Sequence, residues 1–264
     1  MAETFSGFLR RPVNMPIIDV HAHYGEWSFP IYRSAKKDIE EMMNHHGIEK
    51  VILSSSKAIT YDMVEGNMDL NGILDSKSGL YGYVYLNPNY PELSKAEIGK
   101  YLANPLFKGV GEIHQDYSGV SIDSEESISV ISEAAEYRKP FLIHTYSLEN
   151  VRALVELVKK FPDSIFIAGH MGGTVGSGTG LSWKKAIDAA KEYSNIYLEI
   201  CMTLFEKGKL EEAVDKAGAD RIMFGSDLTL LNPAHTIGMV LSAEISRNDR
   251  EKIFYLNAKR VFRL

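Results

Sequence analysis

The chain has 264 residues, of which 45% are hydrophobic and 24% are charged, and its formal net charge at pH 7 is −6. This length fits either one α/β barrel or two small domains, and the composition allows a hydrophobic core of useful size. The negative charge provides no overall basic field, which argues against nucleic acid as a partner.

Residues 1–15 precede the first predicted element, and we expect them to form an N-terminal arm. They lack the apolar stretch of a signal peptide, and no segment of the chain has the ~18 consecutive apolar residues of a membrane span. Cys201 is the only cysteine, so no intramolecular disulfide can form, which is typical of a reducing compartment. We therefore expect a cytoplasmic protein with no membrane segment.

Short runs rich in β-branched and aromatic residues are predicted to be strands. These runs cover residues 17–23, 50–56, 80–88, 107–115, 140–146, 164–173, 195–203 and 221–229. Their nearly continuous apolar character is typical of parallel strands that are covered on both faces.

Charged, helix-like stretches lie between the predicted strands. They include residues 35–47, 124–139, 147–161, 183–193 and 207–218. Ser124 and Ser147 precede two of them as N-cap residues, while Gly47 and Gly218 stand where two others should end. The tail should supply the eighth helix and a closing helix over residues 245–264. This alternation predicts a (β/α)₈ TIM barrel as a single domain over residues 1–264, with a doubly wound open sheet as the alternative.

Ionisable side chains gather in the last positions of these strands, which is where barrel enzymes carry their catalytic groups. In chain order they are Asp19, His21, His23, Glu112, His114, His144, His170, Glu199 and Asp227. A lone core histidine is usually satisfied by a carbonyl or a carboxylate. Five histidines and two carboxylates at one end of a barrel instead indicate a shared divalent metal ion. We expect the other histidines, His45, His46 and His235, to lie on the solvated surface of helices.

As a set, these residues resemble the amidohydrolase superfamily of metal-dependent hydrolases. The resemblance covers nearly the whole chain and is carried by the His-x-His of residues 21–23, by His144 and His170, and by Asp227. The FGSD turn and the final NAKRVF are similar to the amidohydrolase-related ("amidohydrolase 2") group, which includes decarboxylase-like enzymes. The GEI stretch around Glu112 also resembles the TatD-like nucleases, in which this glutamate binds a metal.

The resemblance implies a divalent metal ion, zinc in the first place, with manganese or iron as alternatives. It implies as ligands His21, His23, Glu112, His144, His170 and Asp227. With two ions, His21, His23 and Asp227 would bind the inner ion, His144 and His170 the outer ion, and Glu112 both. With one ion, the ligands would be His21, His23, His144 and Asp227, and His170 would be free to act as a base or to orient water.

Asp227 is expected to be catalytic, accepting a proton from the attacking water and passing it to the leaving group, and His170 is the second catalytic candidate. We expect His114 and Tyr146 to contact the substrate. Further roles are expected behind the ligands, with Glu199 supporting a ligand histidine, Cys201 a buried thiol and Asp19 a supporting or packing residue. Residues 172–180 lack the Gly-Lys-Ser/Thr of a phosphate-binding loop and are predicted to form a lid beside the site.

The implied reaction is hydrolysis of a small amide, lactone or ester by an activated water. Non-oxidative decarboxylation of a small unsaturated or aromatic acid is the alternative. A TatD-like nuclease ranks third, because the chain is acidic. The partner would then be a small-molecule substrate. The sequence leaves open the identity of that substrate, the number of ions and whether the chain forms a homo-oligomer.

Overall fold

The computed structural model describes residues 15–31, 34–173, 181–201 and 207–264. Within these ranges, the strands form one parallel sheet in which each strand pairs with the next in chain order. The strands are β1 (Ile17–Tyr24), β2 (Ile48–Ser55), β3 (Leu80–Val84), β4 (Phe107–Ile113), β5 (Phe141–His144), β6 (Phe166–Gly169), β7 (Ile196–Glu199) and β8 (Ile222–Met223).

The sheet closes on itself through contacts between β1 and the residues at and after β8. The Val20 amide donates to the Phe224 carbonyl at 3.0 Å, the His23 amide donates to the Leu228 carbonyl, and Ala22 forms a parallel bridge with Leu228. The predicted (β/α)₈ barrel is thus confirmed, and the open sheet is excluded.

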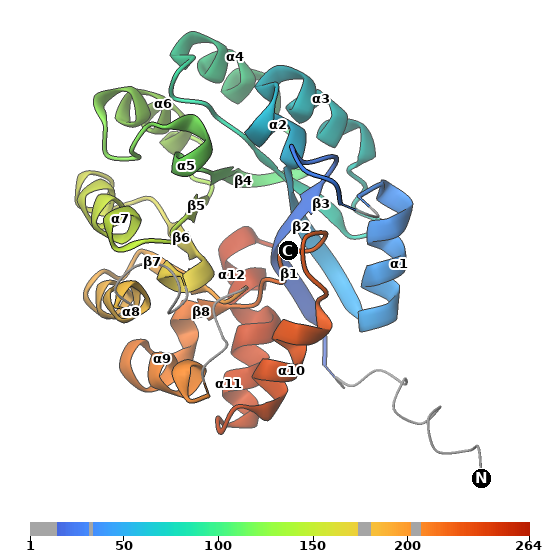
Figure 1. The fold of residues 1–264 in the computed structure, drawn as a ribbon, viewed down its shortest axis with the longest axis vertical. Helices are drawn as coiled ribbons and strands as arrows, with labels where there is room; N and C mark the ends of the chain where they lie inside the picture. The colour runs from blue at the N-terminus through green and yellow to red at the C-terminus, as the bar shows by residue number, and fades with distance from the viewer. Residues whose placement is uncertain (1–14, 32–33, 174–180, 202–206) are drawn as a thin grey trace.

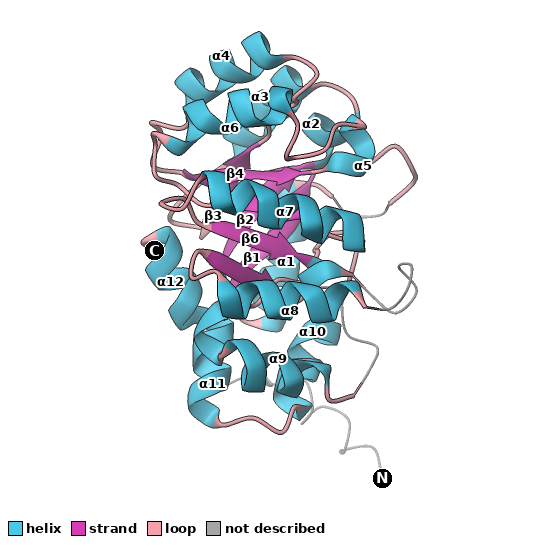
Figure 2. Cartoon of the chain, turned by 90° about the vertical axis from the view of Figure 1, so that its left-hand side faces the viewer, coloured by secondary structure: helices cyan, strands magenta, loops and turns pink. Residues whose placement is uncertain are grey.

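Helices surround the strands, as Figure 1 shows from one end and Figure 2 from the side. The main helices are α1 (Lys36–His46), α3 (Met63–Ile73), α4 (Pro91–Tyr101), α6 (Glu125–Ala135), α7 (Leu148–Lys160), α8 (Ser182–Glu192), α9 (Lys209–Ala217) and α10 (Ala234–Ser242). Shorter turns are α2 (Ser56–Thr60), α5 (Gln115–Ser118), η2 (His170–Gly172) and η3 (Ala219–Arg221). Among the described residues, no helix combines the length and apolar character that crossing a bilayer would require.

The predicted helix boundaries agree with the structure where the sequence carries a capping signal. Ser124 and Ser147 accept hydrogen bonds from the amides of Ser127 and Asn150, which places them at the N-caps of α6 and α7. Gly47 ends α1 in the left-handed conformation that a glycine adopts without steric cost. Helices α3 and α4 were not among the predicted helices, although Asp62 caps α3 by accepting a hydrogen bond from the Glu65 amide and Pro91 begins α4.

The closing segment is a chain of three short pieces, α11 (Arg247–Glu251), the π-helical η4 (Lys252–Leu256) and α12 (Asn257–Phe262). The carbonyl of Ile253 in the π-helical turn accepts a hydrogen bond from the Phe224 amide at 2.9 Å, just after the short strand β8. Ala258 and Phe262 of α12 pack into a buried cluster with Ile18, Leu142 and residues of five other strands. Since this cluster joins strands from opposite sides of the barrel, it fills the barrel interior.

His46 is an exception to the expected surface histidines, because it is 7% exposed. It follows Ile39 and Met43 at helical spacing, and all three side chains are buried on one face of α1. The prediction for His46 was therefore wrong, since charged neighbours on a helix do not reveal which face packs against the sheet.

Candidate metal centre

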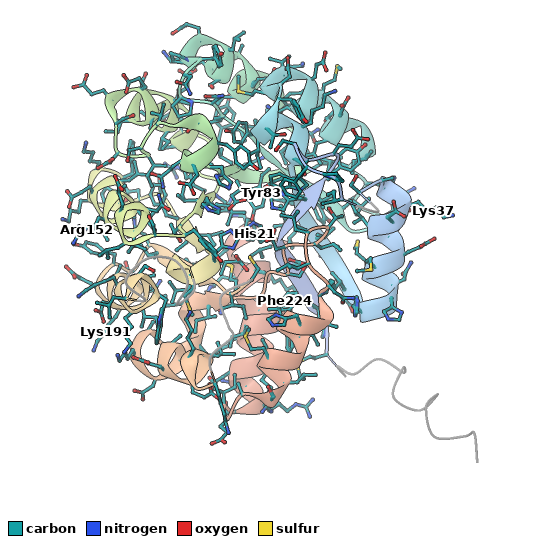
Figure 3. The ribbon with its side chains drawn as sticks, in the orientation of Figure 1. His21, Lys37, Tyr83, Arg152, Lys191 and Phe224 are labelled. Atoms are coloured by element: carbon teal, nitrogen blue, oxygen red, sulfur yellow. The ribbon has the colours of Figure 1, made fainter. Side chains whose placement is uncertain are left out.

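The six predicted ligands converge at the C-terminal ends of the barrel strands. His21 and His23 lie in β1, Glu112 in β4 and His144 at the end of β5, while His170 and Asp227 lie just beyond β6 and β8. None of the six is more than 9% exposed. Figure 3 places His21 near the middle of the barrel, whereas Lys37, Arg152 and Lys191 lie at its periphery.

Local backbone geometry explains why these positions present their side chains together. His21 and His23 are two residues apart in a strand and so point to the same face. His170 and Asp227 have φ values of 61° and 60°, a left-handed conformation that is unusual for residues other than glycine. Such conformations cluster at functional sites, where the surrounding structure holds them in place.

The Glu112 carboxylate lies between two sets of imidazoles. Its Oε2 atom is 3.2 Å from His21 Nε2 and 3.6 Å from His23 Nε2. Its Oε1 atom is 2.8 Å from His144 Nδ1 and 3.3 Å from His170 Nε2. One carboxylate oxygen thus faces each pair of histidines.

Asp227 completes the first of these sets, with its Oδ1 atom 3.1 Å from His23 Nε2 and 4.0 Å from His21 Nε2. Among the described residues, neither His21 Nε2 nor Asp227 Oδ1 has a hydrogen-bond partner, although both atoms are buried. Buried polar atoms are normally satisfied. Imidazole nitrogen and carboxylate oxygen are also standard ligands of divalent metals, so this donor set fits such an ion.

The charges of these groups perturb one another strongly. Burial raises the pKa of Asp227, but the close contact and charge of His23 outweigh that effect and bring the pKa to about 2. Burial lowers the pKa of His144, but Glu112 and Asp116 outweigh it and raise the pKa to about 9. Burial also raises the pKa of Glu112, but His21 and His144 outweigh that effect and hold it well below its usual value. Asp227 and Glu112 are therefore both ionised at neutral pH, as metal ligands must be.

Glu199 lies behind the ligands and is fully buried. Its Oε2 atom accepts a hydrogen bond from His21 Nδ1 at 2.7 Å, and from the His170 amide at 3.1 Å. The Cys201 amide donates to Oε1, and the Cys201 thiol donates to Oε2 at 3.1 Å. Glu199 is thus positioned as expected from the sequence, in contact with His21, one of the predicted ligands.

Among the hydrogen bonds of the described residues, none joins the Asp19 carboxylate to an imidazole ring. Its carboxylate accepts hydrogen bonds from the amides of His21 and Ser226 and from the Ser226 hydroxyl. Burial raises the pKa of Asp19 to about 7. Asp19 thereby ties β1 to the FGSD turn that carries Asp227, in keeping with the expected supporting role.

Further rings adjoin His144 and His170. The His114 ring stacks on His144 with centroids 3.7 Å apart, and the Tyr146 ring lies 5.8 Å from His144 and 5.4 Å from His170. Both predicted substrate contacts are therefore beside the ligands. Tyr117 lies 4.7 Å from His114 and 6.0 Å from Trp27.

Sequence reasoning missed Trp27 and Asp116. The Trp27 ring lies 4.8 Å from the His23 ring, and Asp116 Oδ2 lies 3.5 Å from His144 Nε2. The only signal for them in the sequence is their position, a few residues beyond His23 and Glu112. Two serines at the end of β2 are also engaged: Ser54 accepts a hydrogen bond from the Glu112 amide at 2.7 Å, and Ser55 caps α2. The predicted lid, except for Gly172 and Gly173, lies outside the described residues.

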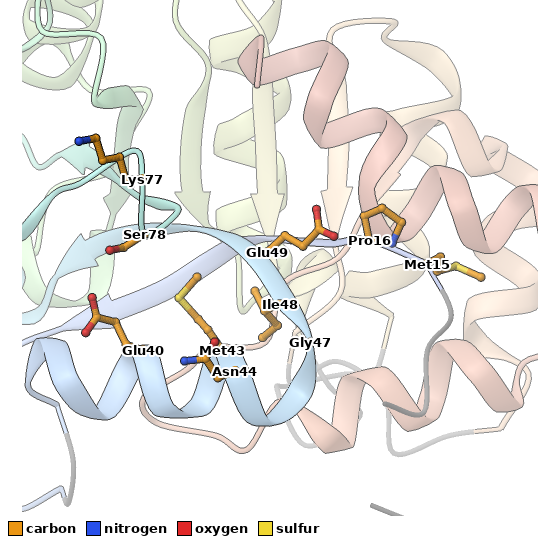
Figure 4. A pocket seen from close by; sticks show the side chains of 10 residues that line it. All are labelled: Met15, Pro16, Glu40, Met43, Asn44, Gly47, Ile48, Glu49, Lys77 and Ser78. Atoms are coloured by element: carbon orange, nitrogen blue, oxygen red, sulfur yellow. The ribbon is translucent and has the colours of Figure 1, made fainter. Parts of the chain in front are cut away.

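A pocket of about 800 Å³ lies far from this centre. Met15 and Pro16 line it where β1 begins, with Gly47 and Ile48 where β2 begins, so it belongs to the N-terminal end of the barrel (Figure 4). Since the centre is at the opposite ends of the strands, this pocket has no part in it. A smaller pocket of about 320 Å³ adjoins Tyr24 and Ser55, where β1 and β2 end.

A family model described as amidohydrolase matches residues 18–264. A comparison with curated proteins gave no significant match. Among solved structures, the chain is similar to a 2,6-dihydroxybenzoate decarboxylase from Rhizobium, with 19% identity and a TM-score of 0.73, over 94% of this chain and 99% of that one.

Two further structures show the same fold. One is a dihydroxybenzoic acid decarboxylase from Polaromonas sp. JS666 with bound manganese and the inhibitor 2-nitroresorcinol. It has 20% identity and a TM-score of 0.72, over 95% of this chain and 97% of that one. The other, from Pseudomonas putida, is provisionally named a 2-pyrone-4,6-dicarboxylic acid hydrolase. It has 15% identity and a TM-score of 0.72, over 95% of this chain and 98% of that one.

Proposed function

This chain belongs to the amidohydrolase family, and we propose that it is a metal-dependent enzyme that removes carbon dioxide from a small unsaturated or aromatic acid. The observation that carries the metal dependence is the convergence of four imidazoles on the Glu112 carboxylate, next to the unpartnered atoms of His21 and Asp227. Hydrolysis was our first expectation from the sequence. The decarboxylases among the structures that share this fold favour decarboxylation instead.

The proposed ligands are His21, His23, Glu112, His144, His170 and Asp227. Their nitrogen and oxygen donors suit manganese, which the Polaromonas enzyme holds, as well as zinc. A divalent ion at this position supplies positive charge that polarises a bound substrate oxygen and lowers the pKa of a bound water.

The side chains of this chain would orient the substrate and move the proton. Asp227 is ionised and buried, and its Oδ1 atom has no hydrogen-bond partner among the described residues, so it can accept a proton and return it. A decarboxylase must place one proton on the carbon that loses carbon dioxide, and Asp227 and His170 are the groups we assign to that transfer. His114 and Tyr146 would contact the planar part of the substrate.

The rings around the centre support a planar substrate. Phe29 and Tyr117 are 45% and 42% exposed and lie beside Trp27, which contacts the ligand His23. Exposed aromatic rings next to a buried polar centre suit stacking on an unsaturated ring or chain. The Lys57 ammonium follows β2 but is engaged by Glu65 at 2.8 Å and Asp69 at 3.0 Å. The substrate carboxylate would therefore depend on the ion for its counter-charge.

Hydrolysis of a small ester, lactone or amide is the second candidate, and Glu112 favours it. A carboxylate with one oxygen toward each pair of histidines is suited to bridge two ions, and paired ions are typical of hydrolytic sites. The comparison with TatD-like nucleases stays a prediction, as do the cytoplasmic location and the absence of a nucleic-acid partner.

The test is product analysis with the manganese-loaded and zinc-loaded protein. We expect carbon dioxide release from hydroxylated benzoates, monitored together with the loss of substrate absorbance, and about one ion per chain by elemental analysis. Cleavage of lactones without carbon dioxide, at two ions per chain, would replace decarboxylation by hydrolysis. A protein that retains no ion after dialysis would refute both reactions.

A further inference from the structure

Cys201 lies behind two of the proposed ligands and has no role in the reaction described above. It is fully buried, two residues after the end of β7. Its Sγ atom is 3.1 Å from His170 Nδ1 and 3.4 Å from His21 Nδ1. The sulfur therefore contacts both rings through the nitrogen on the side away from Glu112.

Glu199 determines how the thiol is oriented. Its carboxylate accepts the His21 Nδ1–H, the amides of His170 and Cys201, and the Cys201 thiol. Three of these donors reach Oε2, and one, the Cys201 amide, reaches Oε1. With its own hydrogen directed to Glu199, the thiol leaves the sulfur lone pairs for the neighbouring Nδ1–H of His170.

This arrangement selects one tautomer of His170. A neutral imidazole carries its proton on one nitrogen and a lone pair on the other. When Nδ1–H is directed to the sulfur, the lone pair lies on Nε2, which is 3.3 Å from Glu112 Oε1 and 3.1 Å from His144 Nδ1. That is the nitrogen a ligand role requires, since a metal binds through a lone pair.

We propose that Cys201 is a positioning residue that holds His170 in the Nδ1–H tautomer and thereby presents Nε2 to the metal centre. The proposal rests on the proposed metal centre but not on whether the reaction is decarboxylation or hydrolysis. The effect resembles that of the carbonyl or carboxylate that commonly accepts the second N–H of a metal-binding histidine.

A different assignment of the same atoms makes Cys201 a ligand. The sulfur, one nitrogen each of His21 and His170, and one oxygen of Glu199 all lie within 4.8 Å of one another. An ion there would need the Nδ1 atoms that now donate to Glu199 and to the sulfur, and it would break the set of four hydrogen bonds on Glu199. We therefore favour a hydrogen-bonding role for the thiol. The two assignments predict different absorption spectra for the Co²⁺-loaded protein.

The experiment measures Mn²⁺ affinity by competition with a chelator for the wild-type protein and for Cys201→Ala, Cys201→Val and Cys201→Ser. Valine fills the space of the thiol with a somewhat larger apolar side chain and lacks an acceptor, whereas serine restores one. We expect alanine and valine to weaken Mn²⁺ binding about tenfold, the lower end of the range for partners of metal ligands, and serine to recover most of the affinity. The control Ser182→Ala removes a buried hydroxyl group on α8 and should leave the affinity unchanged.

The Co²⁺-loaded protein supplies the spectroscopic readout. A positioning role predicts no thiolate-to-cobalt charge-transfer band in the ultraviolet, and such a band would overturn the proposal by making Cys201 a ligand. Wild-type affinity in Cys201→Val, or equal loss in serine and valine, would also overturn it, and valine serves where alanine does not fold. A wild-type protein that binds no Mn²⁺ would instead refute the metal centre itself.

Discussion

Replacing Glu199 by glutamine tests how far the metal centre depends on the hydrogen bonds behind it. Glu199 accepts four donors, of which three reach Oε2 and one, the Cys201 amide, reaches Oε1. In Glu199→Gln one of these oxygens becomes an NH₂ group. Whichever way the amide is turned, at least one buried donor then faces another donor.

The expected magnitude follows from that count. A buried donor left without an acceptor costs about 1–3 kcal/mol. We therefore expect Glu199→Gln to lower the free energy of unfolding of the ion-free protein by about that amount. Since the His21 Nδ1–H loses a charged acceptor, Mn²⁺ binding should weaken about 10- to 100-fold. Urea unfolding measures the first quantity and chelator competition the second.

Glu97→Gln is the matched control. Glu97 is 3% exposed and lies in α4, away from the centre. It accepts a hydrogen bond from the Asn67 side chain at 3.0 Å, which the oxygen of a glutamine can accept equally well. The Mn²⁺ affinity of the Glu97→Gln variant should equal that of the wild-type protein. If Glu199→Gln and Glu97→Gln gave the same stability and the same Mn²⁺ affinity, the argument from four donors would be refuted.

Three further predictions concern Asp227, Glu112 and Ser147. Asp227→Asn should keep the fold but lower the turnover rate about 10²- to 10⁴-fold, because it removes the group assigned to proton transfer, and a rate within threefold of wild type would contradict that role. Burial lowers the pKa of His144, but Glu112 and Asp116 together outweigh it and raise the pKa from 6.5 to about 9, so the stability these contacts give the ion-free protein is complete below pH 6.5 and is lost as the pH rises through 9. The unfolding free energies of wild type and Glu112→Gln should converge over that interval, by less than the roughly 3 kcal/mol of the whole His144 shift because Asp116 remains, as urea unfolding would show. Ser147→Ala removes the N-cap of α7 and should cost about 1 kcal/mol without changing metal affinity, as thermal unfolding and chelator competition can verify.

The sequence predicts most of the barrel because its signals are local. Strand runs and capping residues such as Ser124 and Ser147 depend only on neighbours in the chain, and the structure confirms them. Helix α3 contains two glycines and has no apolar stripe as regular as that of α7, so its formation depends on packing against β2 and β3. His46 shows the same limit, because burial depends on which face of a helix meets the sheet.

Some features of the candidate site likewise depend on local sequence, whereas others depend on segments that are distant in the chain. Strand alternation places His21 and His23 on one face, and a shared barrel end brings them toward the residues of other strands. The contacts of Glu112 with four imidazoles, the four donors on Glu199 and the position of Trp27 all join segments distant in the chain. No spacing in the sequence encodes these distances. They follow from the barrel geometry and from the left-handed turns at His170 and Asp227.

Charge balance links the number of ions to the kind of substrate. Glu112 and Asp227 bring two negative charges into the centre, whereas Glu199 is already surrounded by four donors. One divalent ion with neutral imidazoles therefore makes the centre neutral, while two ions leave a net charge of +2 that an anion must offset. A two-ion centre should thus favour an anionic substrate much more strongly than a one-ion centre. Comparing the affinity for a benzoate with that for its uncharged amide, at one and at two ions per chain, measures this difference. Equal discrimination at both loadings would show that Glu112 and Asp227 do not set the charge of the centre.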